Sequence, residues 1–266
     1  MDSLYEGAIR ANFRARVRNV LAGALLFYAV FPATAQWKWR DPTAPRLPSG
    51  KANLSAPAPK QADGKPDLSG EWLVHDPHLQ FNMAADTPGV ELTPAYAAIY
   101  KEHLEQEGRE RPSGNCLPHS IPDAMLAPTP FKIIHTPKET LILYEEFVDF
   151  RQVFTDGRPL PQDPEPAWFG YSVGRWENGA FVVESRGFND KSWLDDDGHP
   201  HSDALHTIER FRRPDYGHMT LEITIDDPKA YVKPWNATIR FDLVPDTELI
   251  ESVCENNKDP QHMVGK

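Results

Sequence analysis

The feature that most constrains the fold is a two-residue hydrophobic period in the second half of the chain. Leu221, Ile223 and Ile225 alternate with acidic and hydroxyl residues, which is the pattern of a strand with one buried and one polar face. Turn sequences separate such segments, and Asn178-Gly179 is the strongest short hairpin signal among them. Short strands joined mostly by hairpins predict a mainly β protein, an antiparallel up-and-down β-barrel.

The strands are expected at residues 67–72, 131–136, 141–154, 168–176, 180–186, 206–213, 219–226, 238–243 and 249–254. One helix is expected between the first two. Thr93 is its N-cap, Pro94 its first residue, and Gly108 can end it. Its apolar residues recur at helical spacing and predict that one face packs on the barrel: Tyr96, Ile99, Tyr100 and Leu104.

The N-terminus has the three parts of a secretory signal peptide. Four arginines at positions 10–18 precede an apolar run at 20–31, and the small residues Ala33-Thr34-Ala35 follow. The run is shorter than the ~20 residues that a membrane span needs. We therefore expect a signal peptide at 1–35, a Pro/Ala-rich linker at 36–66 and a single barrel domain at 67–266. A periplasmic or secreted location, with no membrane association after cleavage, follows from this division.

Charge and motifs exclude several functions. The formal charge is −11, and removing residues 1–35 removes four arginines and two acids, which leaves −13. A chain this acidic lacks the basic surface that binding to nucleic acids or to anionic membranes requires. The sequence has no glycine-rich phosphate loop, G-x-S-x-G, HExxH or CxxCH motif, and no cofactor is predicted.

The chain has two cysteines, Cys116 and Cys254. In an oxidising compartment such a pair usually forms a disulfide. Neither lies in a CxxC motif or beside an evident activating base, so a redox or nucleophilic role is disfavoured.

Several motifs together carry a resemblance. Gly70-Glu71-Trp72 resembles the G-x-W start of lipocalin-type barrels, where the tryptophan closes one end. The wider set resembles a large family of exported bacterial proteins of acidobacteria and proteobacteria, mostly described as hypothetical: Cys116-Leu117-Pro118, Thr155-Asp156-Gly157-Arg158, Gly174-Arg175-Trp176-Glu177, Leu205 to Phe211 and Asp227 to Tyr231. The resemblance implies a calycin-like barrel and no particular activity. The chain departs from the family at His119 to Asp123, where many relatives have a glycine and then Pro-Arg.

Histidines, acids and arginines are concentrated at residues 193–213, which suggests a site there. A metal could be bound by His199, His201 and His206, but Pro200 disrupts the His-x-His geometry, and a solvated acidic turn explains the same residues. A metal-dependent enzyme that uses these histidines is therefore only the third hypothesis for the function, and no metal ligands are predicted.

A second hypothesis is cofactor-independent acid–base chemistry, as in an isomerase, lyase or hydrolase. His206 and Arg210 share one face of a strand, and Glu209 lies on the other. If His206 and Arg210 point inward, they can meet Glu145 and Arg151. His206 with Glu145 or Glu209 would then carry protons, and Arg151 or Arg210 would hold an anion. A structural ion network fits these residues equally well.

The main hypothesis is that the protein binds a small aromatic or oxygenated organic molecule at the mouth of the barrel. Aromatic walls with a few polar groups are typical of small-molecule pockets. The candidate ligand-binding residues lie at predicted strand ends and loops: Trp168, Tyr171, Trp193, His201, Tyr231 and Trp235.

Overall fold

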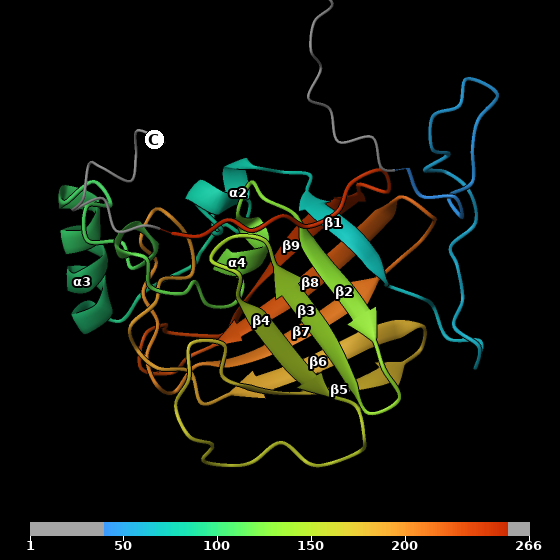
Figure 1. Ribbon diagram of the computed structural model, residues 1–266. Coiled ribbons are helices and arrows are strands. Elements are labelled where there is room, and N and C mark those ends of the chain that lie inside the picture. The colour runs from blue at the N-terminus through green and yellow to red at the C-terminus, as the bar shows by residue number, and fades with distance from the viewer. Residues whose placement is uncertain (1–39, 255–266) are drawn as a thin grey trace, which may run out of the picture. The chain divides into compact units, whose positions relative to one another are not determined.

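The computed structural model describes residues 40–254 and contains a closed nine-stranded β-barrel (Figure 1). The predicted signal peptide at 1–35 lies outside the described residues. Each strand pairs with its neighbours in sequence order, and β1 closes the ring against β9. The strands are β1 (Gly70–Val74), β2 (Phe131–His135), β3 (Glu139–Tyr144), β4 (Phe150–Phe154), β5 (Tyr171–Glu177), β6 (Ala180–Arg186), β7 (His206–Arg212), β8 (His218–Asp226) and β9 (Trp235–Leu243).

This arrangement confirms the predicted barrel and adds one parallel pair. A ring of nine strands cannot alternate in direction all the way round. The parallel pair is β4 with β5, and residues 155–170 connect these strands as the long loop at the bottom of Figure 1. Residues 141–154, predicted as one strand, form parts of β3 and β4 because the chain turns between them, with Phe147 and Val148 at positive φ. Residues 249–254 form no strand, and Ser252 makes an isolated bridge with Glu146.

The barrel interior is mainly apolar, and the alternation decides which side chains enter it. Leu221, Ile223 and Ile225 of β8 are fully buried, as the period predicted. In β3 the inward residues are Thr140, Ile142 and Tyr144, so Leu141 and Leu143 lie on the outer face. Trp72 is fully buried, and its Nε1 donates to the Leu68 carbonyl at 2.9 Å. A tryptophan that closes one end of the barrel was expected from the G-x-W motif.

The expected helix is α3 (Pro94–Glu105), with Thr93 as its N-cap residue. None of its residues is buried. The helix contacts the barrel loops through aromatic and polar side chains. Tyr100 stacks on His199 at 4.4 Å between ring centroids, and Ile99 and Leu104 are exposed. The other helices of the described residues are one turn long: α2 (His78–Phe81), α4 (Asp123–Leu126) and the 3-10 helix η1 (Ser113–Asn115). Across residues 40–254, no helix is long and apolar enough to span a bilayer.

The described part of the predicted linker, residues 40–66, lies along the barrel. Its backbone pairs with the turn before β8, where Tyr216 N donates to Ala56 O and Gly217 N to Leu54 O, each at 2.7 Å. Arg46 also forms an ion pair with Asp246 at 2.5 Å. The segment has the irregular backbone that its composition suggested, but these contacts fix its course.

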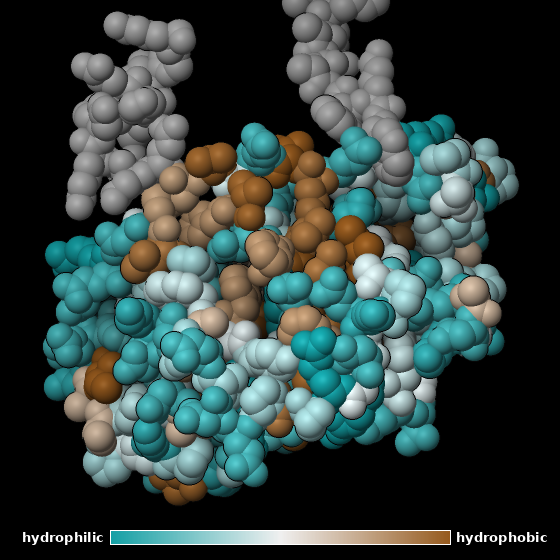
Figure 2. Space-filling view, turned by 60° about the horizontal axis from the view of Figure 1, so that its bottom comes forward, coloured by the Kyte–Doolittle hydropathy of each residue, from teal (hydrophilic) through white to brown (hydrophobic). Residues whose placement is uncertain are grey.

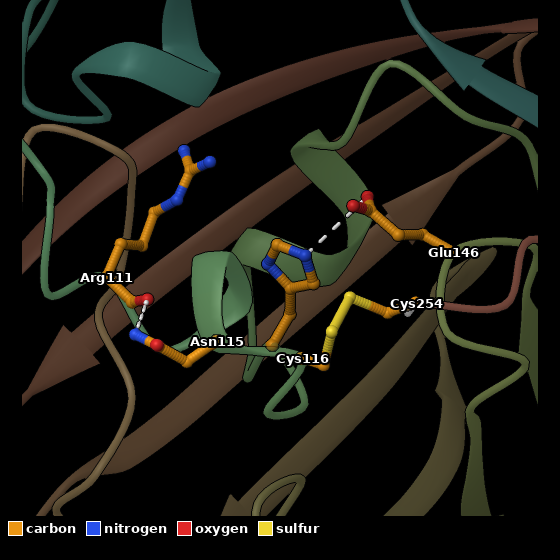
Figure 3. The surroundings of a disulfide bond; sticks show 6 residues. Arg111, Asn115, Cys116, Glu146 and Cys254 are labelled. Carbon is orange, nitrogen blue, oxygen red and sulfur yellow. Dashed lines mark hydrogen bonds and ion pairs between the residues drawn. A yellow bond between two sulfur atoms is a disulfide. The ribbon is translucent and has the colours of Figure 1, made fainter. Parts of the chain in front are cut away.

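The predicted disulfide between Cys116 and Cys254 is present, with a Cα–Cα distance of 5.4 Å. Cys116 follows η1, and Cys254 is the last described residue; Glu146 lies beside the bond (Figure 3). The C-terminal segment is otherwise held by few contacts, such as the hydrogen bond from Phe147 N to Ser252 O at 2.9 Å. The disulfide therefore fixes the end of this segment against the loop after η1, while the backbone bond holds it at the turn between β3 and β4.

Reducing the disulfide should lower the free energy of unfolding. The bond joins residues 138 apart in sequence, and the chain-entropy model gives a stabilisation of up to about 5 kcal/mol for such a loop. We expect a loss of about 2–5 kcal/mol when urea unfolding of residues 36–266 is repeated with a thiol reductant. The variant with both cysteines changed to serine should show the lower stability with and without reductant. Equal stability of the oxidised and reduced protein would contradict the structural role of the bond.

Candidate functional site

The best candidate for a ligand site is a cavity at the parallel junction of β4 and β5. These strands share only two register pairs, Val153 with Ser172 and Phe154 with Val173, whereas β5 and β6 share seven. A cavity of about 430 Å³ opens over the junction, a volume typical of small-molecule sites. We call it the seam pocket; it is lined by Pro118, residues 149–152, Phe154 and residues 167–172.

The walls of the seam pocket are largely aromatic. Phe150, Phe154, Trp168, Phe169 and Tyr171 all line it. Phe150 is 59% exposed, which is unusual for a phenylalanine on a barrel strand. The rings of Phe154 and Tyr171 lie 5.2 Å apart. Phe150 and the partly exposed rings around it offer a flat apolar ligand both stacking and burial.

Arg158 stabilises one wall of the pocket from outside. Its guanidinium lies 3.9 Å from the centre of the Phe154 ring, and its Nη1 donates to the Tyr171 hydroxyl at 3.1 Å. Arg158 is itself held by the Asp156 carboxylate. The turn Asp156 to Arg158 thus orders two of the aromatic walls.

Further exposed apolar residues lie close in sequence to the pocket lining or to the disulfide. Phe150 lines it, Leu117 and Val148 adjoin lining residues in sequence, and Val253 adjoins the disulfide; all four are exposed. Figure 2 shows a band of hydrophobic residues across the upper half of one face of the molecule, with polar residues around it.

Of the six predicted ligand-binding residues, the structure brings Trp168 and Tyr171 to the seam pocket. The other four are buried in the loops and core. Trp193 stacks on His103 at 4.1 Å, and the Tyr231 hydroxyl donates to Pro200 O at 3.0 Å. His201 contacts the Ser192 hydroxyl at 2.7 Å, and Trp235 packs near Tyr231. None of the four lines the seam pocket.

Behind the seam pocket, Arg151 and Glu209 form an ion pair inside the barrel. Their side chains are 1% and 0% exposed. Arg151 Nη1 donates to Glu209 Oε1 at 3.0 Å, and its other nitrogens donate to the hydroxyls of Ser172 and Ser185. Burial disfavours the charged guanidinium, but the Glu209 carboxylate outweighs this effect and holds the pKa of Arg151 above its ordinary value. Two of the five predicted acid–base residues therefore meet, as a fully bonded pair within the protein.

The other three predicted acid–base residues lie elsewhere. Thr207 and Glu209 of β7 point inward, so His206 and Arg210 lie on the outer face. Glu145 is in the turn after β3 and accepts a hydrogen bond from Ile250 N at 3.1 Å. The inward arrangement of His206 and Arg210 that would meet Glu145 and Arg151 is not the one observed.

His206 nevertheless faces a cavity of its own. This cavity of about 440 Å³ is lined by residues 162–164, Pro166, residues 186–188, residues 203–206, Asp226 and Pro228. His206 Nε2 lies 3.0 Å from Glu184 Oε1, and its Nδ1 lies 3.9 Å from Asp226 Oδ2. Burial raises the pKa of Glu184, but hydrogen bonds from His206 and Arg175 outweigh it and lower the pKa below the ordinary value.

The three histidines of the metal hypothesis have separate partners. His199 Nδ1 pairs with Asp195 Oδ2 at 2.7 Å, whereas His201 contacts Ser192 and His206 contacts Glu184. Within residues 40–254, no group of three or more His, Cys, Asp or Glu side chains is arranged to hold a metal ion. Asp195 also accepts from the backbone of Met83, Gly198 and His199, so it organises the loop around it.

A buried charged cluster near the disulfide was missed by the sequence analysis. His119 Nδ1 lies 2.5 Å from Asp123 Oδ2, and Nε2 lies 3.6 Å from Glu146 Oε2. Burial disfavours the imidazolium, but the carboxylates of Asp123 and Glu146 outweigh burial and raise the pKa of His119 to about 10. The His-x-x-x-Asp spacing was the available signal for the first contact, while Glu146 joins through tertiary packing.

Comparisons of the chain with family models, with curated proteins and with solved structures gave no match.

Removing one partner of the buried Arg151–Glu209 pair should destabilise the protein more than replacing both partners with apolar residues. Glu209→Ala leaves the guanidinium without its counter-charge and should cost about 3–5 kcal/mol of unfolding free energy. The double variant Arg151→Met/Glu209→Leu should cost much less, because Ser172 and Ser185 still bond each other at 2.9 Å. Urea unfolding at pH 7 measures both. Equal losses in the single and double variants would contradict the assignment of this cost to an unpaired charge.

His119 should make stability depend on pH in the alkaline range. Its folded-state pKa of about 10 lies above the unfolded value of about 6.5. Its contribution is therefore complete below the unfolded pKa and is lost as pH rises through the folded pKa. Between about pH 6.5 and 10 the wild-type unfolding free energy should fall more steeply than that of His119→Gln. Parallel curves for the two proteins would contradict the raised pKa.

Proposed function

We propose that this protein binds a small aromatic or oxygenated organic molecule in the seam pocket. The observation that carries the proposal is a cavity of about 430 Å³ with five aromatic side chains in its lining. Phe150 remains 59% exposed, and a planar ligand seated there would bury it. The polar residues Asp149, Gln152 and Tyr171 also line the cavity and can orient an oxygen atom.

The proposal includes export to the periplasm or the outside of the cell. The signal-peptide pattern at 1–35 supports it, and so does the Cys116–Cys254 disulfide, because such bonds persist in oxidising compartments. The motif set described above supports membership of the exported bacterial family, as a part of the same proposal.

A second candidate function is acid–base catalysis at His206. It is favoured by the cavity of about 440 Å³ that His206 lines and by its 3.0 Å contact with Glu184. A histidine held by a carboxylate can accept or donate a proton near neutral pH. The cation of this site would be Arg186, which lines the same cavity.

The binding proposal predicts that the affinity of the protein for aromatic probes depends on Trp168. Titration of residues 36–266 with 2-naphthol, followed by its fluorescence, should show saturable binding. Trp168→Ala should weaken it about ten-fold or more, because one wall of the pocket is removed. Phe81→Ala, at a residue 63% exposed and outside the pocket lining, is the matched control and should bind as the wild type does.

Two results separate the candidates. Unchanged binding in Trp168→Ala, or no binding to the wild type, would contradict the seam pocket as the ligand site. His206→Gln should keep the affinity for 2-naphthol if binding is the function. An acid–base enzyme at His206 should instead lose turnover on the order of 10²-fold in that variant.

A further inference from the structure

The lining of the seam pocket contains two charged residues, Arg151 and Asp149. Each nitrogen of the Arg151 guanidinium donates a hydrogen bond inside the barrel, to Ser172, Ser185 or Glu209. Arg151 also forms its ion pair with Glu209 there. The positive charge of Arg151 is therefore already neutralised before any ligand enters the cavity.

Asp149 has no comparable partner. It lies just before β4, where its backbone carbonyl accepts a hydrogen bond from Tyr144 N at 2.9 Å. Among residues 40–254, its side-chain carboxylate takes part in no hydrogen bond or ion pair. Burial raises the pKa of Asp149, and the charge of His119 opposes this shift without cancelling it. A carboxylate that has lost water without gaining a partner is stabilised by a cation that comes close to it.

His119 does not supply the missing counter-charge. Its Nδ1 lies 2.5 Å from Asp123 Oδ2, and its Nε2 lies 3.6 Å from Glu146 Oε2. One imidazolium and two carboxylates leave one negative charge on this group of three residues. The neighbourhood of Asp149 is therefore negative, and the carboxylate that lines the cavity stays uncompensated.

The aromatic walls of the pocket suit a cation as well. The face of an aromatic ring attracts a positive charge, most strongly where water is excluded. Phe154 already has the Arg158 guanidinium 3.9 Å from its ring centre. The other four aromatic residues of the lining are Phe150, Trp168, Phe169 and Tyr171. The cavity thus combines ring faces with one unpaired carboxylate.

We infer that the ligand of the seam pocket is an aromatic amine, whose ammonium group pairs with the Asp149 carboxylate while its ring packs on the aromatic walls. The inference rests on the proposed binding function and specifies the ligand class. An anionic ligand would meet the negative charge of Asp149 and find no unpaired cation in the lining. A neutral ring compound would leave Asp149 without a partner.

Three probes that share a phenyl ring and a two-carbon chain test this inference: 2-phenylethylamine, 2-phenylethanol and 3-phenylpropanoate. At neutral pH they carry a positive charge, no charge and a negative charge. Calorimetry should show that the wild type binds the amine about ten-fold more tightly than the alcohol, and the carboxylate most weakly. Asp149→Asn should weaken the amine about ten-fold and leave the affinity for the alcohol unchanged.

Glu222→Gln is the matched control. The formal charge of the chain is −11, and a protein this acidic attracts cations over its whole surface. Glu222 is exposed on β8 and does not line the pocket, so this variant removes the same charge from a different place. It should bind 2-phenylethylamine as the wild type does. Asp149→Asn should keep the midpoint of thermal unfolding, because the replaced carboxylate bonds to no described group.

The outcomes distinguish the inference from the function on which it rests. Equal affinity of the wild type for the amine and the alcohol, or a preference for the amine that survives in Asp149→Asn, would overturn the inference and leave the pocket as a site for neutral rings. Equal weakening of the amine in Asp149→Asn and Glu222→Gln would also overturn it, since the attraction would then come from the overall charge. If none of the three probes binds the wild type, the proposed function fails together with the inference.

Discussion

The constraint on which the structure depends is the odd number of strands in a closed ring. Eight of the nine neighbouring pairs are antiparallel, and the parallel pair that such a ring requires is β4 with β5. A parallel pair cannot be joined by a tight hairpin, so the chain leaves the sheet at residue 155 and returns at Tyr171. This long connection brings Trp168 and Phe169 to the start of β5, and the short pairing leaves the cavity open beside them.

The Arg151–Glu209 pair inside the barrel adds side-chain bonds across this short pairing. Arg151 on β4 bonds Ser172 on β5, Ser185 on β6 and Glu209 on β7, so one side chain joins four strands across the junction. A buried ion pair of this kind adds little net stability but fixes a particular arrangement when every group is bonded. Strand register at the junction therefore rests on side-chain bonds as well as on backbone pairing.

The local signals of the sequence predicted most of the barrel. Asn178-Gly179 and the alternation in β8 depend only on neighbouring residues, and the hairpin and the strand formed as expected. The face of β7 could not be predicted, because both of its faces carry charged residues and a shift of one residue exchanges them. Arg151 and Glu209 are buried against the usual preference of charged side chains, and only the closed barrel brings them together. Trp168 and Tyr171, predicted from their place at a strand end, line the seam pocket, whereas Trp193, Tyr231 and Trp235 are buried in the core.

The central claim is that this protein binds its ligand at the junction of β4 and β5. Its most direct test is the change in backbone amide NMR shifts of ¹⁵N-labelled residues 36–266 during titration with acetophenone. The account predicts that the shifted amides concentrate at residues 149–154 and 167–172, the two segments that line the seam pocket. Shifts concentrated at residues 186–188 and 203–206, around His206, would contradict it and move the function to the second cavity.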